Sequence, residues 1–250
     1  MQNNLITAFI SIVLILGSYQ FSHAGGAFDT IPQKRKFQFG VYGGHNDSFD
    51  SDVSLNESGT NVSLDDVEWD GDSFGDAPYW GIRLTYWPDS YPNWGFMVDY
   101  THAKIKAETS SGTSSSGNVG NVFDRLEFTD GLNLLTFNGV YRYDYSETIK
   151  PYAGAGIGFA FPHVEVEQSI NNAPVTMEYQ VTGVAAQILA GLEWNLDERF
   201  ALFSEYKLSY ADVDADLDQG GTLETEAFTN HFIFGLSYKF GLSDDLPPLK

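Results

Sequence analysis

The sequence predicts an all-β protein, an eight-stranded antiparallel up-and-down transmembrane β-barrel with an N-terminal signal peptide. Two patterns predict it: an apolar stretch near the N-terminus, and eight segments that alternate apolar with polar residues. The last segment, 223–240, is the clearest. Backbone groups that face hydrocarbon must be satisfied within the protein, so a spanning sheet of such strands has to close into a barrel. The apolar face of segment 223–240 carries Phe228, Phe232, Phe234, Leu236, Tyr238 and Phe240.

The N-terminal segment 1–24 reads as a signal peptide. Residues 6–16 are apolar apart from Thr7 and Ser11, a run too short to span a membrane as a helix, and Ser22-His23-Ala24 is a small-x-small cleavage signal. We expect the mature barrel over 25–241 and a periplasmic tail, rich in Pro and Asp, over 242–250. The chain has no cysteine, which excludes a lipoprotein, a disulfide scaffold and a thiolate metal site.

The formal net charge is -21, which argues against nucleic acid as a partner. The acidity is concentrated in a predicted extracellular loop, about 45–77, and no Lys or Arg occurs from 37 to 82. One interpretation is a solvated loop kept soluble by its charge. The other is a loop that shares the divalent cations that bridge phosphates at a lipopolysaccharide surface.

Each predicted strand lies between turn signals, and an even number places both chain ends on the periplasmic side. Short turns at 88–93, 144–150 and 195–199 alternate with longer polar connections, as periplasmic and extracellular ends do. The expected strands are 35–44, 78–87, 94–107, 125–143, 150–168, 176–194, 200–216 and 223–240. Aromatic residues near the short turns suit a membrane interface: Trp87, Trp94, Tyr143, Tyr152, Trp194, Phe200 and Phe240.

The inward-facing residues of these strands include charges of both signs. An eight-stranded barrel is narrow enough for side chains to fill, so we expect a charge-paired plug instead of a diffusion pore. Gly154, Gly156 and Gly158 would make room for it. The alternative is a proton or ion path through the lumen. The predicted inward residues are Arg83, Asp99, Asn138, Arg142, Gln187, Glu193, Glu205, Lys207, His231 and Lys239.

The outward-facing register becomes polar at the extracellular ends of strands three to six. A spanning strand needs only about nine to eleven residues, so this set should lie near the outer headgroups. Imidazoles beside carboxylates suit acid–base chemistry or a metal site. Alternatively, the strands simply rise above the membrane, or a bulge near Pro162 reverses the parity. The set is His102, Lys104, Glu127, Thr129, His163, Glu165, Glu178 and Gln180.

Several motifs, in this order and spacing, resemble the outer-membrane lipid A oxidase family over nearly the whole barrel. They include 79–87 (YWGIRLTYW), 99–104 (DYTHAK), 126–133 (LEFTDGLN), 162–166 (PHVEV) and 178–183 (EYQVTG). The resemblance implies an enzyme that oxidises the proximal glucosamine of lipid A, the lipid of lipopolysaccharide, to 2-aminogluconate, with molecular oxygen as electron acceptor. Asp72 departs from the family, where a Lys is expected.

Residue roles for such a reaction follow from side-chain chemistry. His163 or His102 would be the base, oriented by a carboxylate, and a metal of unknown identity would be held by His102, His163 and Glu165. No Gly-rich loop opens a helix, so no nicotinamide or flavin is expected. The expected catalytic residues are His163, Glu165, Glu178, His102 and Glu127. The expected substrate-binding residues are Lys104, Lys106 and Gln180, the two lysines for lipid A phosphates.

Two other functions compete with the oxidase. The first is a non-enzymatic barrel that stabilises the envelope or binds a surface partner through its acidic loop. The second is a lipid A hydrolase. Both enzymes would depend on the polar outer set, whereas the structural protein would not.

Overall fold

The computed structural model describes residues 36–75, 78–170 and 173–241. The predicted signal peptide 1–24 and tail 242–250 lie outside the described residues. Among the described residues, no helix is long and apolar enough to cross a membrane.

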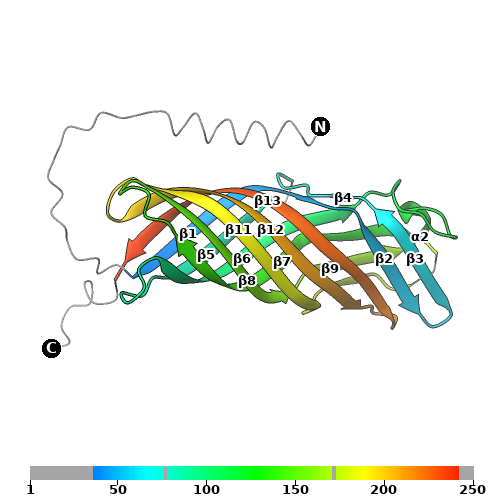
Figure 1. The fold of residues 1–250 in the computed structure, drawn as a ribbon. Helices are drawn as coiled ribbons and strands as arrows, with labels where there is room; N and C mark the ends of the chain where they lie inside the picture. Colours follow the sequence, from blue (N-terminus) through cyan, green and yellow to red (C-terminus); the bar gives the residue numbers. More distant parts are fainter. Residues whose placement is uncertain (1–35, 76–77, 171–172, 242–250) are drawn as a thin grey trace. The chain divides into compact units, whose positions relative to one another are not determined.

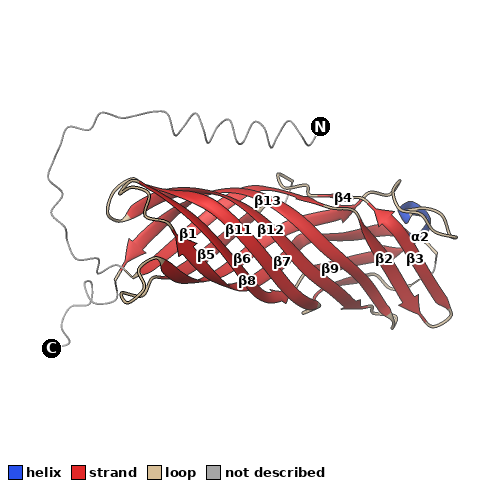
Figure 2. Ribbon diagram, in the orientation of Figure 1, coloured by secondary structure: helices blue, strands red, loops and turns tan. Residues whose placement is uncertain are grey.

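Eight long antiparallel strands form a closed ring (Figures 1 and 2). β1 pairs with β13 on one side and with β5 on the other, and the pairing of β6 with β7 completes the circle. The predicted barrel is therefore confirmed. In ring order the strands are β1 (Phe37–Ser48), β5 (Trp80–Tyr86), β6 (Trp94–Ala107), β7 (Phe123–Arg142), β8 (Ile149–Ala160), β11 (Gly183–Asn195), β12 (Phe200–Asp216) and β13 (Thr222–Phe240).

Two of the predicted strands are interrupted near the extracellular end. The segment 150–168 divides at Pro162, which lacks a backbone N–H, into β8 and β9 (His163–Gln168). The segment 176–194 divides into β10 (Thr176–Tyr179) and β11. Tyr179 pairs with His163, but Gly183 pairs with Ala160, so this strand contains one extra residue. An extra residue reverses which side chains of β10 face outward.

The predicted acidic loop is a folded extension of the barrel. It contains β2 (Ser51–Glu57), β3 (Thr60–Val67) and β4 (Trp69–Asp70); β2 pairs with the end of β13, and β4 pairs with β6. With the short helix α2 (Val119–Val122) these strands gather at one end of the barrel (Figure 1). Acidic side chains such as Asp52, Asp65 and Asp66 are exposed, as the solvated-loop interpretation expects, but the segment is not an irregular loop, because alternate residues are apolar and pack together. The core at this end includes Val53, Leu55, Leu64, Val67, Trp69, Phe123, Phe128, Val164, Val166 and Leu223.

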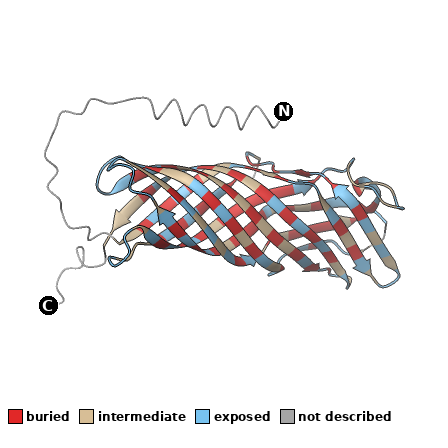
Figure 3. Ribbon diagram, viewed as in Figure 1, coloured by how far each residue is buried: buried red, intermediate tan, exposed pale blue. Residues whose placement is uncertain are grey.

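Polar and charged side chains fill the lumen, and buried and exposed residues alternate along the strands (Figure 3). Three ion pairs cross it: Arg83–Glu205 at 2.7 Å, Lys207–Asp99 at 2.5 Å and Lys239–Glu193 at 2.6 Å. Arg142, near the periplasmic end, lies 4.1 Å from the centre of the Trp87 ring. A Cβ on Gly156 would stand 2.1 Å from Asn138 Oδ1, so this strand passes close to the plug. The predicted charge-paired plug is confirmed.

Large apolar side chains cover the outer face of the ring. Phe96 and Ile157 are 68% and 70% exposed, as expected where lipid is the neighbour. Trp94, Trp194 and Phe200 are exposed near the short turns, in agreement with the predicted aromatic belt. Two members of that belt face inward instead. Tyr152 donates to Glu205 at 2.8 Å, and Trp87 Nε1 donates to Gln38 Oε1 at 3.2 Å.

Candidate functional site

A bulge between β6 and β7 shapes the outer wall. The ladder runs as far as Ala103 opposite Leu132 and resumes with Ile105 opposite Phe128, so β7 carries three residues, 129–131, where β6 has one. Gly131 adopts a φ of 116°, which favours glycine, and Asp130 is exposed. On β6, Ala103 and Ile105 stay buried. The row His102, Lys104 and Lys106 therefore keeps the predicted outward parity.

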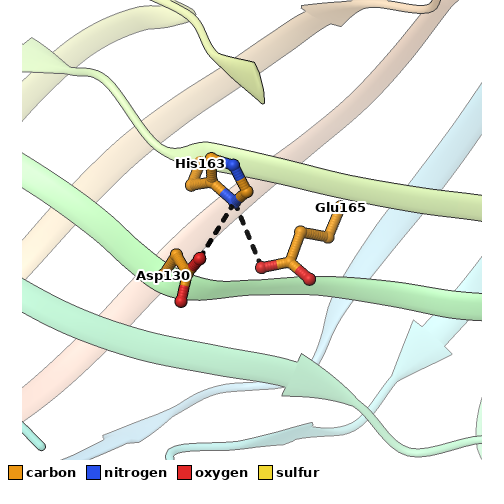
Figure 4. A group of neighbouring side chains, drawn as sticks. All are labelled: Asp130, His163 and Glu165. Carbon is orange, nitrogen blue, oxygen red and sulfur yellow. Dashed lines mark hydrogen bonds and ion pairs between the residues drawn. The ribbon is translucent and has the colours of Figure 1, made fainter. Parts of the chain in front are cut away.

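On β9, His163 meets two carboxylates. Val164 and Val166 are buried, so His163 and Glu165 lie on the outer side, and Pro162 does not reverse the parity of this segment. His163 Nδ1 lies 3.1 Å from Glu165 Oε1 and 3.8 Å from Asp130 Oδ2 (Figure 4). Thr129 Oγ1 donates to Glu165 Oε1 at 3.1 Å. We call Asp130, His163 and Glu165 the wall triad.

The wall triad suits a divalent metal ion. One ligand atom from each residue lies within 4.8 Å of the other two. One imidazole nitrogen and two carboxylate oxygens form a donor set that first-row divalent metals accept. Glu165 is buried, and its orientation is fixed by Thr129 and His163. Carboxylates that bind metal ions are usually held by such hydrogen bonds. The donor set therefore fits the predicted metal, with Asp130 in place of His102.

Three cations stand beside the wall triad. Lys104 Nζ pairs with Asp72 Oδ2 at 3.0 Å, and its side chain is only 7% exposed. Lys106 is half-exposed and lies 3.9 Å from Glu127. Arg125 lies 3.7 Å from Glu127 and 3.6 Å from Glu165. An open pocket of about 340 Å³ contains the two lysines and two members of the wall triad. It is lined by Asp72, Lys104, Lys106, Glu127, Thr129, Asp130 and Glu165.

His102 occupies a separate position on the same wall. Its Nδ1 lies 2.9 Å from Asn133 Oδ1, and its ring stacks on Trp80 with centroids 5.6 Å apart. Gly131 lies beside it, because a Cβ there would stand 2.5 Å from His102 Nδ1. Among the described residues, His102 does not belong to the group that could share a metal ion. The expectation that His102 and His163 bind one metal ion together is therefore not supported by their positions.

Glu178 and Gln180 are not where the sequence placed them. Glu178 pairs with Val164, whose buried side chain points away from the wall, so Glu178 lies on the opposite face from His163. The side-chain amide of Gln180 accepts from Asp216 N at 2.9 Å and donates to Asp216 O at 2.8 Å. Gln180 therefore connects the segment between β10 and β11 to β12 by two hydrogen bonds. The extra residue between β10 and β11 is the cause of both errors.

Sequence reasoning missed four residues of this wall. Asp130 completes the wall triad, Arg125 borders it, and Asn133 binds His102. Tyr179 lies with its ring 4.7 Å from that of His163 and donates to Asp130 O at 3.2 Å. The dipeptide Asp130-Gly131, inside an otherwise alternating strand, was the available signal for a bulge. Which side chains a bulge brings together depends on the pairing with the neighbouring strands, and this pairing cannot be read from the sequence of one strand.

The site lies at the upper edge of the lipid-facing surface. His102 lies eight positions after Trp94, which belongs to the lower aromatic belt. At about 3.3 Å per residue and a tilt of about 40°, this is about 20 Å along the barrel axis, against an apolar band of about 25 Å. Lys104 and Lys106 follow on the same strand. The pocket therefore faces the region where outer-leaflet headgroups would lie.

The chain was compared with known proteins and solved structures. The chain is similar to Neisserial surface protein A, with 16% identity over 82% of this chain and 97% of that one, and a TM-score of 0.45. It is also similar to OprG from Pseudomonas aeruginosa, with 12% identity over 83% and 97% of the two chains, and a TM-score of 0.48. No curated protein matches the chain.

The model of one protein family covers most of the sequence. It is described as the outer membrane protein beta-barrel domain, and it matches residues 39–240, from β1 to the last residue of β13. The matched region contains the ring apart from the first two residues of β1, and it contains the outer-wall site. The chain belongs to the outer membrane protein beta-barrel domain family and is located in the outer membrane.

Proposed function

We propose that this protein is an outer-membrane enzyme that oxidises the proximal glucosamine of lipid A to 2-aminogluconate, with molecular oxygen as the electron acceptor. The observation that carries the proposal is the wall triad, an acid–base cluster that opens sideways at headgroup height. A lipid sugar in the outer leaflet would reach this pocket without entering the barrel. The motifs that resemble the lipid A oxidases include His102, Asp130, His163 and Glu165 of this wall.

The reaction requires one base and a path for two electrons. The anomeric carbon loses its hydrogen and the hemiacetal oxygen loses its proton, so that a C=O bond forms and a lactone results. Dioxygen takes up the two electrons and two protons and becomes hydrogen peroxide. Water then opens the lactone to a carboxylic acid, so that the sugar gains one oxygen atom overall. The outer wall offers two imidazoles, His102 and His163, that would take up the hydroxyl proton.

A bound metal would supply the electron path to dioxygen. The residues that would hold it are Asp130, His163 and Glu165, whose donor atoms already lie together. The chain's own residues prepare that position: Thr129 orients the carboxylate of Glu165, and Tyr179 packs against the His163 ring. Arg125, 3.6 Å from the other oxygen of Glu165, balances part of the negative charge.

Lys106 and Arg125 are the cations best placed for a lipid A phosphate. Their side chains are 55% and 41% exposed, and each is farther than 3.5 Å from its carboxylate partners. Charge-assisted hydrogen bonds to phosphate would be shorter and stronger than these contacts. Lys104 differs, because Asp72 already pairs with it. The carboxylate of Glu127 lies between Lys106 and Arg125, and its negative charge reduces the repulsion between these two cations.

The test uses the purified barrel in detergent with lipid A whose anomeric hydroxyl is free. Mass spectrometry should show a gain of one oxygen atom on the proximal sugar, and one hydrogen peroxide should form per product. His163→Ala and Glu165→Gln should each reduce the rate by about 100-fold or more. Asp144→Asn, at a periplasmic turn, removes a carboxylate far from the wall and is the matched control.

A folded native protein that leaves lipid A unchanged would contradict the proposal. It would favour the non-enzymatic barrel, for which the folded extracellular core of β2 and β3 is the supporting observation. Loss of an acyl chain without gain of oxygen would indicate a hydrolase instead.

A further inference from the structure

Tyr100 and His102 share one hydrogen-bond acceptor on the outer wall. The Tyr100 hydroxyl donates to Asn133 Oδ1 at 2.8 Å, and His102 Nδ1 lies 2.9 Å from the same oxygen. The orientation of the Asn133 amide is set independently by its nitrogen. Nδ2 lies 3.4 Å from Gly131 O and 3.3 Å from Phe161 O, two carbonyl oxygens that only accept. The amide oxygen therefore faces His102.

This arrangement selects one tautomer of His102. An amide oxygen only accepts hydrogen bonds, so Nδ1 must carry the hydrogen. In a neutral imidazole the lone pair is then on Nε2. Among the described residues, Nε2 has no hydrogen-bond partner, and it is not one of the buried unpartnered atoms, so it reaches the surface of the wall. Trp80 packs against the ring and limits its rotation.

His102 lies beside the bulge of β7 that carries Asp130 of the wall triad. His102 and Asn133 face each other on β6 and β7, and Gly131 lies between His102 and Asp130. A side chain at Gly131 would strike the His102 ring, with Cβ only 2.7 Å from Cε1. The His102 ring therefore packs against the residue that follows Asp130 of the wall triad, at a position of the wall that carries no side chain.

We propose that His102 Nε2 takes up the hydroxyl proton of the sugar and that Asn133 is the positioning residue that keeps the lone pair of the neutral imidazole on this nitrogen. The inference rests on the proposed function and divides its work between the two histidines. The proton moves from the hemiacetal oxygen to Nε2, and the carbon-bound hydrogen leaves with two electrons for dioxygen. The proton on Nε2 then passes to the reduced oxygen, which completes hydrogen peroxide. His163 is then a ligand and His102 the base.

A purely structural Asn133 would also tie β7 to Phe161, so the test needs a readout that this role would not change. Nitrogen-15 NMR of labelled histidine in the full-length protein in detergent reports which ring nitrogen is protonated. The His102 signals are those missing from His102→Gln. We expect Nδ1–H and an unprotonated Nε2 in the native protein. Asn133→Asp retains an acceptor and should preserve this tautomer, whereas Asn133→Leu should lose it.

Rates measured on the same proteins complete the test. His102→Gln should lower kcat by about 10²- to 10⁴-fold, the usual contribution of a general base. Asn133→Leu should lower it by about 10- to 100-fold with little change in KM, and Asn133→Asp should recover part of the loss. Tyr100→Phe removes the other donor to Asn133 Oδ1, and we expect it to leave the His102 tautomer in place.

The outcomes separate this inference from the proposed function. A native His102 with Nε2–H, or a His102→Gln protein that oxidises lipid A at the native rate, overturns the inference and leaves the oxidase standing. A native protein that shows the expected tautomer but oxidises no lipid A refutes the oxidase and, with it, the role of His102 as a base. The expected tautomer together with the graded losses in rate supports both.

Discussion

The carboxylate of Asp99 lies 2.5 Å from the ammonium of Lys207, and both side chains are completely buried. Asp99 is on β6 and Lys207 on β12, which stand four strands apart in the ring of eight. The same ammonium donates to Thr101 Oγ1 at 2.9 Å, and Tyr42 donates to Asp99 at 2.9 Å. The pair therefore ties opposite walls of the barrel together.

Asp99→Ala should strongly destabilise the barrel, because it leaves the Lys207 ammonium buried without its counter-charge. Removing one partner of a buried pair typically lowers the free energy of unfolding by about 3–5 kcal/mol. The double variant Asp99→Leu with Lys207→Met should recover most of the loss, because it removes both charges. Urea-induced unfolding in lipid vesicles measures this difference. Equal stability of Asp99→Ala and the native protein would refute the role given to the pair.

Gly131→Ala should damage the outer-wall site while the barrel stays folded. The new Cβ would stand 2.5 Å from both His102 Nδ1 and Asn133 Oδ1, and the φ of 116° is unfavourable for alanine. We expect lipid A oxidation to fall more than about tenfold, as for a small displacement of catalytic groups. Gly139→Ala on the same strand is the matched control, because nothing lies within 4 Å of its added Cβ. Equal activity of the two variants would contradict the geometry.

A divalent metal ion should bind to the wall triad. Titration of the chelator-treated protein with Mn²⁺ or Co²⁺, followed by calorimetry, should show one site per chain that Asp130→Asn weakens by about tenfold or more. Asp124→Asn is the control. Asp124 is also an exposed carboxylate on β7, but it is not a member of the wall triad and instead accepts a hydrogen bond from Ser169 at 2.7 Å. Binding that both variants weaken equally would indicate general attraction to the acidic surface instead.

Asp72→Asn should strengthen the binding of a phosphate-bearing lipid. The substitution leaves Lys104 without the carboxylate that now pairs with it at 3.0 Å, so a phosphate would gain a charged donor. We expect an increase of about tenfold in affinity, the usual size of one charge-assisted hydrogen bond. Glu226→Gln removes the same charge on β13, where the carboxylate accepts from Tyr210. If this control strengthens binding equally, net charge is the cause and Asp72 has no special role.

The sequence alone predicted the ring and its lumen because both follow from a local period of two. Arg83, Asp99, Glu205 and Lys207 could be placed inside from the parity of their own strands, and their ion pairs confirm it. The hairpin of β2 and β3 was missed. Its many acidic residues are typical of a loop, and only a few apolar residues, such as Val53 and Leu55, indicate a strand.

The outer wall was predicted less completely, because bulges are settled by pairing between strands. His102, Lys104, His163 and Glu165 kept their expected side. The extra residues at 129–131 brought Asp130 beside His163, and the extra residue before β11 carried Glu178 to the other face. Neither shift can be recognised from the alternation of apolar and polar residues within the strand where it occurs.

The central claim is that the wall oxidises lipid A, and mass spectrometry of lipid A tests it most directly. The sample comes from cells that express this protein, grown with and without oxygen, and empty-vector cells provide the baseline. We expect an oxygen-dependent gain of about one oxygen atom on the proximal sugar, and we expect His163→Ala to abolish it. Unchanged lipid A in cells that contain the folded native barrel and its substrate would show that this protein is not a lipid A oxidase.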